Sequence, residues 1–256
     1  GFTAMLLDKL KKHSNKSPIL IASSIQAALD NLYGKSKKAA ENEIFKYAKE
    51  NSVNTYVYRL PNVFGKWCRP NYNSVVATFC YNIANGLPIK INNPKTKLNL
   101  VYIDDVVNEF IKALSDAVLK VGNYCEIPTV YNIELGTLSR LIESFKASRE
   151  NLLVPDTSDL LTKKLYSTYL SYLSKDNFSY PLKMNIDNRG SFTEFIKTIN
   201  NGQISINISK KGIAKGNHWH HTKNEKFLVI YGTGVIRFRK VGSEEIVEYY
   251  VNGDKL

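Results

Sequence analysis

The chain has 256 residues, of which 43% are hydrophobic and 23% are charged, and its formal net charge is +12. This composition is typical of a folded protein with one or two domains. The sequence has no run of about 18 apolar residues, so we expect no membrane span. The basic residues are spread along the chain without a basic stripe or a nucleic-acid-binding motif. We therefore expect no nucleic-acid partner and attribute the charge to a surface that meets anionic small molecules.

The cysteines and the N-terminus indicate the compartment. Cys68, Cys80 and Cys125 are odd in number and widely spaced, which favours reduced thiols over a disulfide scaffold. The first residues lack the charged start and apolar core of a signal peptide, and the first residue is not methionine. We therefore expect a cytoplasmic protein with no membrane partner, and a sequence that begins within a longer chain.

Residues 1–155 alternate helical patterns with short apolar runs, which predicts a parallel sheet with crossover helices. The predicted strands are 18–22 and 55–60. The predicted helices are 5–13, 35–51, 73–85 and 104–116. Asp104 or Asp105 is expected to cap the last helix rather than to take part in chemistry.

From residue 178 onwards the apolar pattern changes to a period of two, with Gly and Asn turns between the runs. The predicted strands are 191–198, 203–209, 227–230, 234–238 and 246–251. Several short strands at regular spacing are typical of a sandwich or a barrel. The polar segment 156–177 is expected to be a helical connector, so we predict two domains, 1–155 and 178–256.

Tyr33 and Lys37 form a Tyr-x-x-x-Lys pair in a predicted helix, where residues four apart share a face. A nearby ammonium favours the phenolate, so the pair can exchange a proton with a carbonyl or an alcohol while a nicotinamide handles hydride. Such pairs are common by chance. Here, however, Ser23 and Ser24 end the preceding strand, at the sheet edge where ligands bind in open α/β folds.

A metal site is predicted between Gly212 and Gly232. In a strand His218 and His220 would point to the same face, and Glu225 would return a carboxylate after a turn at 222–224. Two imidazole nitrogens and one carboxylate suit a divalent transition metal. The alternative is that these histidines are ordinary polar surface groups.

The first domain resembles the extended short-chain dehydrogenases/reductases that act on nucleotide sugars, through Ser-Ser, Tyr-x-x-x-Lys, Arg-x-x-Asn-Val-Phe-Gly and Asp-Asp-Val. By that resemblance Ser24, or Ser23 in its place, would hydrogen-bond the reacting oxygen. Tyr33 would be the acid/base, and Lys37 would lower its pKa and hold the nicotinamide ribose.

The same resemblance implies further binding residues. Pro61 would line the nicotinamide, and Asn62, with Arg59, would bind the substrate; ordinary strand-end pairing is the alternative for Arg59 and Asn62. The family's glycine-rich loop, G-x-x-G-x-x-G, does not occur in this sequence. We therefore expect a partial Rossmann-like parallel sheet that does not bind the cofactor by itself.

The stretch from Gly212 to Gly232 resembles the first motif of the cupin β-barrel, G-x5-H-x-H-x4-E-x6-G. That resemblance implies a partial cupin barrel in 178–256. Its divalent metal, zinc in this family, would be held by His218, His220 and Glu225. A second cupin motif supplies a further histidine, which we do not find before Leu256, so we expect an incomplete ligand set.

A reductase domain followed by a cupin domain resembles the bifunctional capsular polysaccharide biosynthesis enzymes of the CapF type. The resemblance is also carried by 166–173 and by 187–195, where Arg189 would meet the diphosphate; the alternative is a surface arginine in a tight turn. It implies a homodimer that takes a UDP-sugar.

The reaction implied by this resemblance has two steps. The cupin domain would epimerise C3 of a UDP-4-keto-6-deoxy-N-acetylhexosamine, and the first domain would reduce C4 with NADPH or NADH. The product would be UDP-N-acetyl-6-deoxy-L-talosamine. The alternatives are a nucleotide-sugar enzyme of other stereochemistry, or a non-catalytic cupin module on a degenerate reductase domain.

Overall fold

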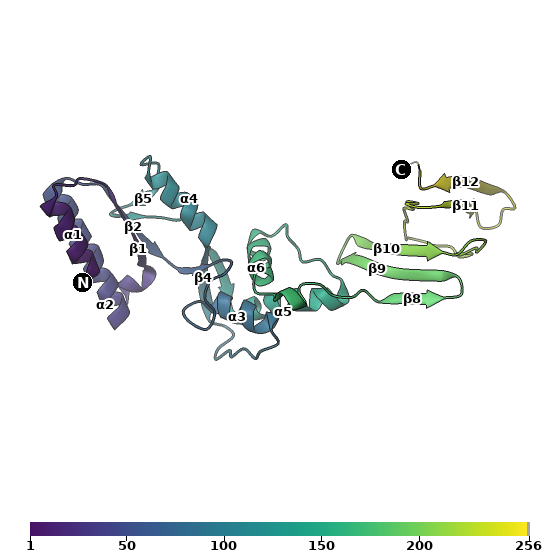
Figure 1. Ribbon diagram of the computed structural model, residues 1–256, viewed down its shortest axis with the longest axis horizontal. Coiled ribbons are helices and arrows are strands. Elements are labelled where there is room, and N and C mark those ends of the chain that lie inside the picture. Colours follow the sequence, from purple (N-terminus) through teal and green to yellow (C-terminus); the bar gives the residue numbers. More distant parts are fainter. Residues whose placement is uncertain (255–256) are drawn as a thin grey trace. The chain divides into compact units, whose positions relative to one another are not determined.

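The computed structural model describes residues 1–254, which form two compact units (Figure 1). The first unit is Gly1–Ser209 and the second begins at Lys210. In the described part of the chain no helix is long and apolar enough to cross a bilayer.

The first sheet of unit 1 has the predicted parallel arrangement at its centre. Its strand order is β1-β2-β6-β5, with bounds β1 (Ile19–Ser24), β2 (Thr55–Leu60), β6 (Tyr124–Cys125) and β5 (Lys120–Val121). β1 is parallel to β2, and β2 is parallel to β6, while β5 and β6 form a short antiparallel pair. The helix α2 (Leu32–Asn51) connects β1 to β2. The predicted strands 18–22 and 55–60 and the predicted helix 35–51 are therefore confirmed.

Helices cover both faces of this sheet (Figure 1). Val57 of β2 packs with Leu7 of α1 (Phe2–Lys12) and Ile44 of α2. The next residue, Tyr58, packs on the opposite side with Ala113 of α4 (Ile103–Ala113). Successive side chains of a strand alternate between faces, so this burial pattern gives the helix–sheet–helix layering of a Rossmann-like fold.

A second, three-stranded sheet follows. It contains β3 (Asn62–Phe64), β4 (Lys97–Tyr102) and β7 (Tyr131–Glu134), with β3 parallel and β7 antiparallel to β4. The core beside it includes residues of α3 (Val75–Ala84), α5 (Leu135–Asn151) and α6 (Leu160–Leu170). Segment 156–177 is helical as predicted, in α6 and η2 (Lys175–Asn177). Leu165 and Tyr169 are buried in this core, so α6 packs with α3 and α5.

The capping prediction for the helix at 104–116 was wrong. α4 begins at Ile103 with Tyr102 in the N-cap position, so Asp104 and Asp105 lie in the first helical turn. Carboxylates still stabilise a helix there, because the N-terminal end of the helix dipole is positive. Asp105 also forms an ion pair with Lys164 of α6 at 2.6 Å.

The third sheet is antiparallel, in the order β10-β9-β8, and ends unit 1. Its strands are β8 (Met184–Asp187), β9 (Gly190–Thr198) and β10 (Gly202–Ser209). A bridge between Leu153 and Lys197, with the Val154 amide donating to the Lys197 carbonyl at 2.9 Å, ties β9 to the chain that follows α5. This attachment extends the first compact unit to Ser209.

The described part of unit 2, up to residue 254, contains one hairpin, β11 (Thr233–Arg239) and β12 (Ile246–Asn252), which confirms the strands predicted there. The strand predicted at 227–230 was wrong, because these residues have no regular structure and Phe227, Leu228 and Ile230 remain exposed. An apolar run becomes a strand only where another strand pairs with it. The strands described from Met184 to Asn252 form two separate antiparallel sheets and do not close a barrel.

Candidate functional site

Tyr33 and Lys37 lie on the first two turns of α2. The helix starts after Asn31, whose side-chain oxygen accepts a hydrogen bond from the Gly34 amide at 2.7 Å. Lys37 Nζ is 5.6 Å from the centroid of the Tyr33 ring, so the predicted shared helix face is confirmed. Half of the Tyr33 side chain, 51%, is exposed and can be reached by a substrate.

Ser24 is the last residue of β1, and a short 3-10 helix, η1 (Ile25–Ala28), connects it to α2. Its hydroxyl accepts from the Gln26 amide at 3.2 Å. η1 and α2 approach so closely that a Cβ on Gly34 would lie 2.2 Å from the Gln26 carbonyl oxygen. Glycine at this position therefore lets Ser24 and Tyr33 lie at the two ends of one compact connection.

Ser23, the alternative to Ser24, is engaged elsewhere. It is buried, and its hydroxyl donates to Glu41 Oε1 at 2.5 Å. Ser24 is partly exposed and lies at the end of the strand. Of the two serines, Ser24 is therefore the one placed to meet a ligand.

Arg59 and Asn62 both pair within the protein. The Arg59 guanidinium donates to both oxygens of Glu41, from Nε at 2.9 Å and from a terminal nitrogen at 2.6 Å. Asn62 opens β3, and its side-chain amide donates to the Asn99 carbonyl of β4 at 3.1 Å. Both residues show the strand-end pairing that the sequence left open. Pro61, between β2 and β3, is partly buried.

The residues His218, His220 and Glu225 are brought together, although not in the predicted way. One potential ligand atom from each lies within 4.8 Å of the others, and His220 Nε2 is 3.6 Å from Glu225 Oε2. Residues 213–220 form no strand, so the prediction that a strand aligns the two histidines was wrong. Asn217, next to His218, has a left-handed backbone with φ at 58°.

The chemistry of this cluster fits a divalent transition metal, since two imidazoles and a carboxylate can each give one ligand atom. Glu225 also forms an ion pair with Lys223. The hydrogen bond from Lys223 lowers the pKa of the Glu225 carboxyl, which favours the ionised form that a metal requires.

Arg189 lies in the turn between β8 and β9. Its guanidinium contacts Asp187 Oδ2 from two nitrogens, at 2.9 and 2.7 Å, and its amide donates to the same carboxylate. Both side chains are about half exposed. This is the tight-turn arrangement given above as the alternative to diphosphate binding.

Comparison with known proteins identifies the family. Residues 15–133 match the NAD dependent epimerase/dehydratase family, and residues 185–256 match the polysaccharide biosynthesis C-terminal domain. A UDP-2-acetamido-2,6-beta-L-arabino-hexul-4-ose reductase from Pseudomonas aeruginosa is 44% identical over 253 residues, which are 99% of this chain and 68% of that protein.

Solved structures agree. The capsular polysaccharide assembling protein CapF from Staphylococcus aureus superposes with a TM-score of 0.92 at 52% identity, covering 100% of this chain and 71% of that one. CapF with the inhibitor 3-isopropenyl-tropolone gives a TM-score of 0.90 at 50% identity, with the same coverage. The chain belongs to the CapF family. As a CapF-family protein it is an enzyme whose first domain is of the NAD-dependent epimerase/dehydratase type.

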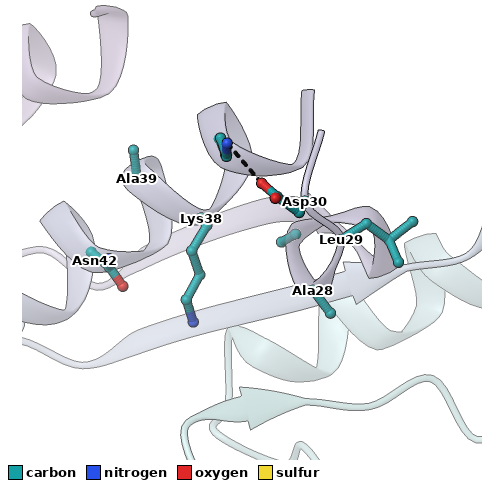
Figure 2. A pocket seen from close by; sticks show the side chains of 8 residues that line it. Ala28, Leu29, Asp30, Lys38, Ala39 and Asn42 are labelled. Atoms are coloured by element: carbon teal, nitrogen blue, oxygen red, sulfur yellow. Dashed lines mark ion pairs between the residues drawn. The ribbon is translucent and has the colours of Figure 1, made fainter. Parts of the chain in front are cut away.

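A shallow pocket of about 400 Å³ lies beside α2 of this CapF-family chain, as Figure 2 shows. It is lined by residues of η1, the connection to α2 and α2 itself, including Lys35 and Lys38. Lys35 is paired with Asp30 at 2.7 Å. None of the predicted site residues lines the pocket, so it does not mark the Tyr33 site.

Sequence reasoning missed Glu41, which the CapF-family fold places at the centre of a buried polar cluster. Its side chain is fully buried, with Ser23, Arg59 and Tyr124 bound to it. A signal for it exists, because Glu41 falls on the apolar stripe of its helix, three residues before the buried Ile44. A charged residue on a buried stripe requires a partner.

Proposed function

We propose that this chain carries the C4-reduction site of a UDP-sugar enzyme in capsular polysaccharide precursor synthesis. The observation that carries the proposal is the 44% identity, over nearly the whole chain, with a protein named as a UDP-hexul-4-ose reductase. The exposed Tyr33 beside Lys37 on α2 supports it, since a ketone reductase needs a proton donor at the substrate.

Each residue of this group has a distinct role in the reduction. When bound, NADPH or NADH supplies hydride to C4 of the keto sugar. Ser24 donates a hydrogen bond to the carbonyl oxygen, and Tyr33 transfers its phenolic proton to the alkoxide that forms there. Lys37 favours the resulting phenolate and binds the nicotinamide ribose, and solvent then reprotonates Tyr33.

Two residues where β2 ends and β3 begins complete the proposed binding site. Pro61 lines the nicotinamide, and the exposed Asn62 contacts the phosphates of the UDP-sugar. Arg59 donates from two nitrogens to the buried Glu41, so it would contact the substrate through its remaining N–H groups.

The second part of the proposal concerns residues 178–256, as a cupin-type domain that epimerises C3 before reduction. The neighbouring ketone makes the C3 proton acidic, because it can hold the charge of the enolate. His218, His220 and Glu225 would bind a divalent metal, proposed as zinc, which would polarise the substrate or brace the fold. Arg189 would contact the diphosphate. The proposed product is UDP-N-acetyl-6-deoxy-L-talosamine, and the proposed assembly is a homodimer.

The test of the reductase is oxidation of NADPH by the full-length protein in the presence of a UDP-4-keto-6-deoxy-N-acetylhexosamine. We expect turnover that depends on Tyr33, and a 6-deoxy-talo product by NMR. A product of other stereochemistry would support the proposed reductase activity and contradict the proposed product. Binding of the sugar nucleotide without any turnover would instead favour a non-catalytic module.

The epimerase is tested separately, by exchange of the C3 proton with deuterium from solvent in the absence of NADPH. Exchange that persists when Tyr33 is replaced by Phe is expected, because the two reactions use different domains. Absence of exchange in the zinc-loaded protein would contradict the epimerase proposal, and it would not bear on the reductase proposal.

A further inference from the structure

The buried Glu41 carboxylate connects four elements of the first sheet region. It lies on α2 and has no solvent exposure. It accepts from Ser23 at the end of β1, from Arg59 near the end of β2, and from Tyr124 Oη of β6 at 3.1 Å. Burial alone would raise the pKa of Glu41, but the hydrogen bonds from Arg59, Ser23 and Tyr124 outweigh it and keep the pKa below its ordinary value.

Tyr124 extends the cluster along α2. Its ring lies under the Arg59 guanidinium, 4.1 Å from centroid to Cζ, and packs edge-on against Phe45 at 5.6 Å. Lys38 Nζ is 3.3 Å from its hydroxyl and 3.7 Å from the Glu41 carboxylate. Lys38, Glu41 and Phe45 are three and four residues apart, so they form one stripe of the helix.

This stripe fixes the rotation and the axial position of α2 against the sheet. Apolar contacts are non-directional and tolerate small shifts of a helix, whereas a buried carboxylate with three directional donors does not. Any sliding of α2 by a fraction of a turn would separate Glu41 from Arg59 and leave the guanidinium without its carboxylate.

The elements held by the cluster are the ones that carry the proposed catalytic residues. Tyr33 and Lys37 lie two turns and one turn before Glu41 on α2. Ser24 directly follows Ser23, and Pro61 comes two residues after Arg59. The residues of the cluster therefore lie within two residues or two helical turns of those that would contact the substrate and the nicotinamide.

We propose that Glu41 is a positioning residue, which sets the placement of Tyr33 and Lys37 relative to Ser24 through its bonds to Ser23, Arg59 and Tyr124. The proposal rests on the reductase function proposed above. Misplacement of a reacting group by about 1 Å can lower a rate by about 100-fold, so a device that fixes α2 has a direct kinetic effect.

The experiment is a double-mutant cycle between Glu41→Gln and Tyr33→Phe in the full-length protein, with NADPH oxidation as the readout. If Glu41 acts through Tyr33, Glu41→Gln lowers kcat by about tenfold or more in the wild-type background and by less than about twofold in the Tyr33→Phe background. A purely structural role would lower the rate by the same factor in both backgrounds, and that result would overturn the proposal.

The matched control is Glu109→Gln. Glu109 is also a buried helical glutamate, on α4, and it is paired with Lys112 at 2.6 Å rather than with the α2 cluster. We expect this variant to change kcat by less than about twofold in either background. An effect of Glu109→Gln equal to that of Glu41→Gln would show a general response to loss of a buried acid and would also overturn the proposal.

Tyr124→Phe covers the case in which Glu41→Gln does not fold. It removes one hydrogen bond to Glu41 and keeps the ring beneath Arg59, and β6 carries none of the proposed catalytic residues. We expect the same non-additive pattern with a smaller fall in kcat, about two- to fivefold. An unchanged kcat would contradict the proposal. If Tyr33→Phe itself leaves the reduction rate unchanged, the reductase assignment fails instead, so the two failures are distinguishable.

Discussion

The Tyr33 region and the histidine segment of unit 2 are built in opposite ways. Tyr33 and Lys37 lie on a helix that is held by a fully buried carboxylate and packed against a sheet. His218, His220 and Glu225 lie in a segment without regular structure, all three exposed, and Glu225 is bound to a lysine. The protein alone organises the first group, whereas the second gathers ligands that a metal would have to complete.

The largest effect is expected from Tyr33→Phe. Loss of the phenolic proton donor should lower kcat for ketone reduction by about 10²- to 10⁴-fold, the contribution of a positioned general acid. Because the Tyr33 side chain is half exposed, thermal stability should stay the same. NADPH oxidation and a melting curve measure the two quantities, with Tyr72→Phe, another exposed tyrosine, as control. Equal losses in both variants would contradict a specific role.

His220→Ala tests the second region. Zinc affinity should fall by about 100-fold or more, since loss of even an outer-shell partner weakens metal binding by about 10- to 100-fold. Equilibrium dialysis with metal analysis measures this, and His221→Ala is the control because its ring contacts Trp219 rather than the cluster. The rate of ketone reduction should not change. Unaltered zinc binding in His220→Ala would exclude this metal site.

Glu41→Gln tests how much the buried carboxylate that holds the Tyr33 region contributes to the free energy of unfolding. The substitution leaves Arg59 charged and without its carboxylate, and breaking a buried pair costs about 3–5 kcal/mol. Because Arg59 keeps 25% of its side chain exposed, we expect a smaller loss, about 2–4 kcal/mol in urea unfolding. Arg189→Gln, which breaks the exposed pair with Asp187, should cause no measurable change. Similar results for the two variants would refute the contrast between a buried and an exposed pair.

The smallest expected effect is the pH dependence of that stability. The pKa of Glu41 is lowered from its ordinary value of 4.5, so the unfolded chain binds the proton more readily than the folded protein. The stabilisation by the carboxylate is therefore complete above pH 4.5 and decreases as the pH falls through the lower, folded-state pKa. Melting curves of wild type and Glu41→Gln should converge as the pH falls below 4.5. A difference that is constant down to pH 3 would contradict the assignment.

Local periodicity predicted the parts of this fold that depend on near neighbours. The helix at 35–51 and the strand at 55–60 were predicted within a few residues, because each carries an apolar pattern that only one secondary structure can bury. The shared face of Tyr33 and Lys37 follows from helix geometry alone. The spacing of His218, His220 and Glu225 likewise identified three residues that the structure brings together.

Tertiary structure decided what distant segments supply. Ser23, Arg59 and Tyr124 are separated from Glu41 by 18, 18 and 83 residues, so no local pattern shows that they bind its carboxylate. The same applies to Arg59, which pairs with Glu41 while its substrate contact stays a prediction. The strand expected at 227–230 is absent because pairing depends on a neighbouring strand rather than on its own apolar residues. The sequence by itself determined which residues could act, and the packing of α2 on the sheet determined which of them are held in place.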